Sequence, residues 1–143
     1  MTTLLWSVLF FFAANAAPTL DQVRADGNPE HRAKAAVEYA ALAERAAELA
    51  NENGDDTRLA ADIKSMVAAM ELARDSFTAA GKTPYRQPGS FKSVELQSHQ
   101  ILHRLTDLQN KMDLDQKATL DEPIMKIQEI HDTWFDGIMG KKK

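Results

Sequence analysis

The 143-residue sequence contains no cysteine. This absence excludes disulfide bonds, thiolate metal ligands, a cysteine nucleophile and covalent attachment of c-type haem. Large apolar side chains are also scarce: the 127 residues after position 16 include only 24 Leu, Ile, Val or Phe, against 19 Ala. The net charge is only −4, which argues against a disordered polyelectrolyte and against a nucleic-acid partner. The composition therefore indicates a folded, alanine-rich helical protein.

Residues 1–16 contain no charged side chain. Residues 4–14 form an apolar run that is too short to span a membrane as a helix. The sequence Ala-Asn-Ala at 14–16 offers the small residues that a signal peptidase reads, although no Lys or Arg precedes the run. We therefore expect residues 1–16 to be a signal peptide cleaved before Ala17. The alternatives are an uncleaved helix at the membrane edge and an unusual N-terminal core helix. A cleaved signal peptide implies that the chain is exported, to the periplasm or the extracellular space, and that it has no integral membrane span.

Beyond residue 27, apolar side chains recur at alternating spacings of four and three, the pattern of helices that bury one face. The polar leader 17–27 precedes them, and we expect it to be poorly ordered apart from a turn capped by Thr19. Caps and helix-ending glycines such as Asn28, Gly54 and Gly81 separate the helical segments. The expected helices cover residues 28–53, 56–80, 91–112 and 122–139, and a basic tail occupies residues 141–143.

Four helices can bury all their apolar faces together, so we predict an all-α, antiparallel up-down bundle over residues 28–140. A solenoid of 34-residue helical repeats is the rival architecture. Its helices are much shorter than those expected here, and no unit of this sequence recurs.

The first long helix has two apolar stripes. One mixes alanine with larger side chains and consists of Ala35, Tyr39, Leu42, Ala46 and Leu49. The other contains only alanine, at positions 36, 40, 43, 47 and 50. Small residues allow a neighbouring helix to approach closely, although each buries little area. Long alanine-rich helices can also pair between two chains, which leaves a homo-oligomer open.

Patterns that carry catalysis or metal binding are incomplete. His99 and His103 have the spacing of the zinc-protease motif, but Gln100 replaces the glutamate that acts as general base. Both histidines point away from the apolar face of their helix, so we expect them to face solvent. The sequence contains no serine-nucleophile, phosphate-loop or dinucleotide-binding pattern. We expect no catalytic residues, no metal site and no enzymatic activity.

His131 lies among Ile127, Trp134 and Ile138 on the apolar face of the last helix. We expect a core histidine hydrogen-bonded to a polar neighbour. The alternative is a haem ligand, because the chain resembles exported bundles of the cytochrome b562 type, which use a His on the last helix. That resemblance also implies a Met near the start of the first helix. The sequence has only His31 there, so we expect no cofactor.

Leu105 to Gln109 match the pattern Leu-Thr-x-x-Gln. The pattern resembles that of periplasmic stress chaperones of the Spy and CpxP type, which are exported, cysteine-poor and all-helical. The resemblance implies a chaperone-like role as an alternative function. Leu105 and Leu108 also fit ordinary core positions of a helix, which explains them without that role.

A basic connection lies between the second and third helices and separates two acidic stretches of the chain. It carries Lys82, Arg86 and Lys92, interleaved with Tyr85 and Phe91. The aromatic side chains are expected to close one end of the bundle. The alternative is an interaction surface for an acidic or anionic partner, formed by these five residues.

The carboxyl end has Gln-Glu-Ile-His-Asp at 128–132 and Gly-Ile-Met-Gly at 137–140, followed by lysine. This ending resembles that of a group of uncharacterised exported bacterial helical proteins. The resemblance implies export and helical structure but supplies no activity. The predicted function is an exported, non-enzymatic helical protein that binds another protein or an envelope component.

Overall fold

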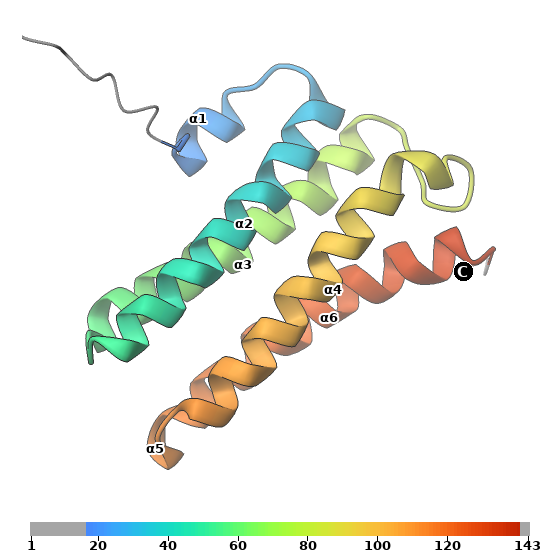
Figure 1. Cartoon of the computed structure of the whole chain (residues 1–143). Helices are drawn as coiled ribbons and strands as arrows, with labels where there is room; N and C mark the ends of the chain where they lie inside the picture. The colour runs from blue at the N-terminus through green and yellow to red at the C-terminus, as the bar shows by residue number, and fades with distance from the viewer. Residues whose placement is uncertain (1–16, 141–143) are drawn as a thin grey trace, which may run out of the picture.

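The computed structural model describes residues 17–140. The predicted signal peptide and basic tail lie outside the described residues. The helices are α1 (Leu20–Arg24), α2 (Pro29–Glu52), α3 (Asp56–Ala79), α4 (Pro88–Lys111), α5 (Leu114–Lys117), the 3-10 helix η1 (Ala118–Leu120) and α6 (Asp121–Ile138). Residues 17–140 contain no strand, and four long helices pack into a bundle, which confirms the predicted fold class (Figure 1). No helix within this range is long and apolar enough to cross a membrane.

The ends of the long helices follow from local sequence. The side chains of Asn28 and Asp55 accept hydrogen bonds from backbone N–H groups in the first turns of α2 and α3. Gly54 and Gly81 adopt left-handed φ angles of 67° and 69° after the last turns, a conformation that favours glycine. Helix α4 begins three residues before the expected start, because Pro88 suits a first helical position that needs no N–H donor.

Residues 17–27, which we expected to be poorly ordered, include the short helix α1. The Thr19 side chain accepts a hydrogen bond from the Gln22 backbone, and the Gln22 side chain accepts one from the Thr19 backbone. This reciprocal capping box stabilises the turn that the sequence predicted. Val23 is buried, and α1 contacts both α2 and α3. Two apolar side chains, the buried Val23 and the partly buried Leu20, together with the double cap therefore hold the segment against the bundle.

Two helical hairpins form the bundle. Helices α2 and α3 make the first hairpin, and α4 and α6 make the second (Figure 1). Consecutive long helices run antiparallel, and the connection of residues 80–87 joins the hairpins at one end. Helix α2 lies beside α4, and α3 lies beside α6. Since directions alternate along the chain, these two cross-hairpin pairs run parallel.

The first hairpin is held by the all-alanine stripe of α2. Ala36, Ala40, Ala43, Ala47 and Ala50 are all buried, and α2 and α3 make the most extensive contact among the described helices. Large side chains of α3 complete this part of the core, namely Leu59, Ile63, Met66, Met70 and Phe77. The stripe of Ala35, Tyr39, Leu42, Ala46 and Leu49 is only partly buried: Ala35 and Tyr39 pack against the edge of the core, whereas Leu42 and Leu49 are 50% and 58% exposed.

Aromatic side chains close the bundle near the 80–87 connection. The ring centroids of Phe77 and Phe91 lie 4.1 Å apart, and Trp134 meets Phe77 edge-on at 5.9 Å. These residues belong to α3, α4 and α6, so they join the two hairpins. At the same end, α6 packs against the connection at Gly137. A Cβ atom there would lie 2.3 Å from Pro84 Cγ. The contact therefore requires glycine.

Replacing Gly137 with alanine is expected to destabilise the protein by about 1–3 kcal/mol, because the new methyl group overlaps the Pro84 ring. The same change usually stabilises a helix interior by up to about 1 kcal/mol. Gly89 provides the control, since a Cβ atom there meets nothing within 4 Å. Urea denaturation should show a lower midpoint for Gly137→Ala and an unchanged or higher one for Gly89→Ala. Equal midpoints for the two variants would contradict the packing described.

Candidate functional site

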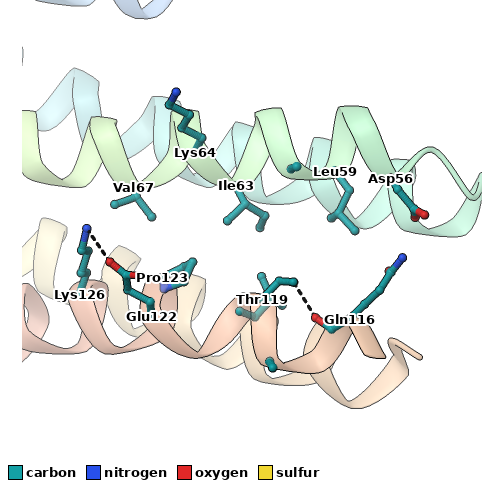
Figure 2. Close-up of a pocket in the computed structure, with 13 residues that line it drawn as sticks. Asp56, Leu59, Ile63, Lys64, Val67, Gln116, Thr119, Glu122, Pro123 and Lys126 are labelled. Carbon is teal, nitrogen blue, oxygen red and sulfur yellow. Dashed lines mark hydrogen bonds and ion pairs between the residues drawn. The ribbon is translucent and has the colours of Figure 1, made fainter. Parts of the chain in front are cut away.

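The hollows along the seam between the two hairpins include two large grooves, and a smaller one of about 180 Å³ lies between Arg74 of α3 and Trp134 of α6. The first has a volume of about 540 Å³ and lies between the N-terminal half of α3 and the segment from α5 to the start of α6 (Figure 2). It exists because α6 has 18 residues whereas α3 has 24, a deficit of roughly 9 Å of helix. The short elements α5 and η1 occupy this end instead. We call this hollow the apolar groove.

The walls of the apolar groove are mainly hydrocarbon. Figure 2 shows Leu59, Ile63 and Val67 pointing from α3 across the groove toward Thr119 and Pro123. The three α3 residues are four positions apart and form a strip of roughly 12 Å along the helix. Such a strip offers an apolar contact surface and no reacting group.

Ionic groups lie around the rim of the apolar groove. Lys126 Nζ lies 3.2 Å from Glu122 and 4.0 Å from Glu71. Asp56 stands at one end, and Lys64 borders the α3 side with its amino group pointing away from the hollow in Figure 2. Neither Asp56 nor Lys64 forms an ion pair within residues 17–140. These two charges are therefore available to a bound partner.

The second groove is polar and has a volume of about 640 Å³ between α2 and α4. Its centre is Arg104, whose Nε donates to Glu44 Oε2 at 2.9 Å and whose Nη2 donates to Glu48 Oε2 at 2.8 Å. This ionic contact links the two hairpins. The other lining side chains are Ala41, Arg45, Gln97, His99, Gln100, Ile101 and His103.

Glu44 is fully buried, and its Oε1 receives no hydrogen bond from the described residues. Burial raises the pKa of Glu44 to about 7, and the neighbouring Glu48 carboxylate adds to the rise against the opposing effect of Arg104. Burial alone would also raise the pKa of Glu48, but hydrogen bonds from Glu44 and Arg104 lower it. Glu44 therefore takes up a proton as the pH falls below about 7, whereas Glu48 stays ionised. Glu44 is not among the residues predicted from the sequence, although it lies between Ala43 and Ala47 of the buried stripe.

His131 is buried at 7% exposure, as expected for a core histidine. Its Nε2 lies 3.0 Å from Glu95 Oε1, and its Nδ1 lies 3.2 Å from Asp132 Oδ1. The rings of His99 and Phe135 lie 5.7 and 5.9 Å away. Because both ring nitrogens have carboxylate neighbours, coordination of haem iron would require one contact to break. Within residues 17–140, no group of three or more His, Asp or Glu side chains is arranged to hold a metal ion.

The two motif histidines are exposed, as predicted. His103 Nδ1 lies 3.3 Å from Asp107 Oδ2, one turn along the same helix. His99 and His103 border the polar groove, a neighbourhood that the spacing of the motif did not predict.

The five residues of the predicted basic connection are partly buried and partly exposed. Phe91 belongs to the aromatic core rather than to the surface, so it closes the end of the bundle. Lys82 pairs with Glu30 and donates to Ser90 Oγ at 3.3 Å. Tyr85, Arg86 and Lys92 are exposed. Only these three of the five candidate residues therefore offer a free surface.

The Leu-Thr-x-x-Gln residues have structural positions. Leu105 and Leu108 are buried. Gln109 Nε2 donates to the Lys117 carbonyl at 2.9 Å and to Asp121 Oδ1 at 2.7 Å. Gln109 therefore ties the end of α4 to the turn that starts α6.

No protein-family model, curated protein or solved structure matches this chain.

Ionisation of Glu44 should make stability depend on pH. Its raised pKa means that the folded state binds the Glu44 proton more tightly than the unfolded state does. The contribution of Glu44 to the free energy of unfolding therefore increases as the pH falls from about 7 toward 4.5, by as much as about 3 kcal/mol. Urea denaturation at pH 5 and pH 8 measures this change: relative to Glu44→Gln, wild type should be more stable at pH 5 than it is at pH 8.

Glu129→Gln removes an exposed carboxylate from α6 and serves as the control. The free energy of unfolding of Glu129→Gln should differ from that of wild type by the same amount at pH 5 and at pH 8. A constant difference between wild type and Glu44→Gln would show that Glu44 does not titrate in this range.

Proposed function

We propose that this protein is exported, has no enzymatic activity, and binds a helical segment of a partner protein of the cell envelope in the apolar groove. The observation that carries this proposal is the hydrocarbon wall of the apolar groove, where Val67 is half-buried and the edges of Leu59 and Ile63, which are 6% and 7% exposed, face the hollow. Apolar residues at helical spacing are the surface into which an amphipathic helix packs.

Groove length and rim charges define the partner. The α3 wall extends from Asp56 to Val67, which is roughly 16 Å and matches about three turns of helix. The partner segment needs apolar side chains at spacings of three and four to fill the strip. A basic residue at the Asp56 end and an acidic residue near Lys64 would complement the two unpaired charges.

The chemistry of the groove supports binding rather than catalysis. Thr119 is the one hydroxyl among its lining side chains, and it donates to the Gln116 carbonyl at 2.6 Å. No histidine lines the groove to activate it. Export rests on the apolar segment 4–14 and the small residues that follow it.

Site-specific photocrosslinking in cells tests the docking site. A benzoylphenylalanine at Val67, which is half-buried in the groove, should yield one discrete protein adduct. Lys64→Glu should reduce that adduct severalfold by repelling the acidic residue of the partner. The probe at Thr133, an exposed α6 residue outside the apolar groove, is the matched control and should yield no adduct.

The pattern of adducts separates the candidate functions. Identical adducts from Val67 and Thr133, or none from Val67, would overturn the proposed docking site. Many different adducts from Val67 would favour the chaperone-like alternative. That alternative is supported by large apolar side chains exposed outside the groove, at Leu96, Leu114, Met125, Phe135 and Met139.

Export makes a separate prediction. The intact mass of protein recovered from the envelope fraction should correspond to a chain that begins at Ala17. Replacing Ala16 with phenylalanine should block cleavage, because signal peptidase requires a small residue there, whereas Asn15→Gln should still be processed. A mass that includes residues 1–16 in the wild-type protein would contradict cleavage.

A further inference from the structure

The outward face of α2 carries an apolar stripe that the bundle covers only in part. It consists of Ala35, Tyr39, Leu42, Ala46 and Leu49, and we call it the outer stripe. Leu42 and Leu49 are 50% and 58% exposed, whereas the three other side chains are half-buried. The alternating spacing of four and three is that of a coiled-coil seam. Ala35 and Tyr39 touch the core from its edge, but Leu42 and Leu49 stay exposed because α3 and α4 pack on the all-alanine face.

Two opposite charges flank one edge of the outer stripe. Glu38 and Arg45 immediately precede Tyr39 and Ala46, so they occupy equivalent positions of successive seven-residue repeats. Both side chains are exposed, and neither forms an ion pair within the described part of the chain. The nearby Glu44 and Glu48, in contrast, bind Arg104. The edge therefore presents one free anion and one free cation, roughly 10 Å apart along the helix.

We propose that a second copy of this chain docks on the outer stripe, with the two α2 helices antiparallel and a two-fold axis near residues 41 and 42. The axis places Glu38 against the partner's Arg45, and the same pair repeats on the other side of the axis. Leu42 packs on the partner's Tyr39. The small side chain of Ala46 meets the partner's Ala35, so the two helices approach closely.

The charges select the antiparallel arrangement. A parallel pair would place Glu38 and Arg45 beside the opposite edge of the partner stripe. That edge is formed by Ala36, Ala43 and Ala50, which carry no charge and are buried against the core of their own bundle. An antiparallel pair brings the charged edges together and satisfies both charges twice. The apolar groove lies between α3 and α6 and is not part of this surface, so the inference is independent of the proposed function.

Light scattering and sedimentation equilibrium on protein expressed from the full-length sequence test the dimer. Wild type should have twice the mass of one chain at micromolar concentrations. Leu42→Glu should give the mass of one chain, since it places two carboxylates in the seam. Leu96→Glu is the matched control: Leu96 is 55% exposed on α4, and this variant should remain dimeric. Circular dichroism should show unchanged helix content in both.

Charge exchange tests the orientation. Glu38→Arg or Arg45→Glu alone should weaken the dimer at least severalfold, because like charges then face each other. The combined variant should return to wild-type affinity, because the opposite charges face each other again. A wild-type monomer at every concentration, or a dimer that survives Leu42→Glu, would overturn the proposal. Failure of the combined variant to recover would overturn the antiparallel register.

Discussion

The close contact between α2 and α3 is the constraint on which the remaining structure depends. Alanine contributes little buried area, so this interface gains stability only if the helices approach closely enough for the larger α3 side chains to reach the α2 backbone. That contact buries one face of α2. The outer stripe must then face away from the core, and the second hairpin must pack along the remaining sides of α2 and α3.

The two hairpins are joined by interactions of different kinds along their length. Phe77, Phe91 and Trp134 make an apolar contact beside the 80–87 connection. Farther along, Arg104 provides an ionic contact between α4 and α2. Toward the other end, α6 begins short of the start of α3, and α5 and η1 lie there with the apolar groove between them and α3. Both large grooves lie along this seam, so the surface available to partners follows from incomplete closure between two well-packed hairpins.

Most of the fold could be predicted because its determinants are local. Asn28, Asp55, Gly54 and Gly81 mark helix ends through their own hydrogen bonds or φ angles, and the seven-residue patterns indicate helices. The sequence could not decide which stripe of α2 is buried, since both have the same period. That choice depends on the side chains of α3 and α4. The apolar groove and the buried Glu44 arise from relative helix length and from tertiary contacts, which no single segment encodes.

The close contact between Pro84 and Gly137 limits how chains can associate. The hairpins are connected by residues 80–87 alone, so an extended connection would let each hairpin pack on its counterpart from another molecule, reproducing every native contact of the seam. Such domain exchange costs little when the connecting segment is loosely held. Here Pro84 packs on the backbone of α6. Straightening the connection would lose that contact, which favours the arrangement in which both hairpins belong to one chain.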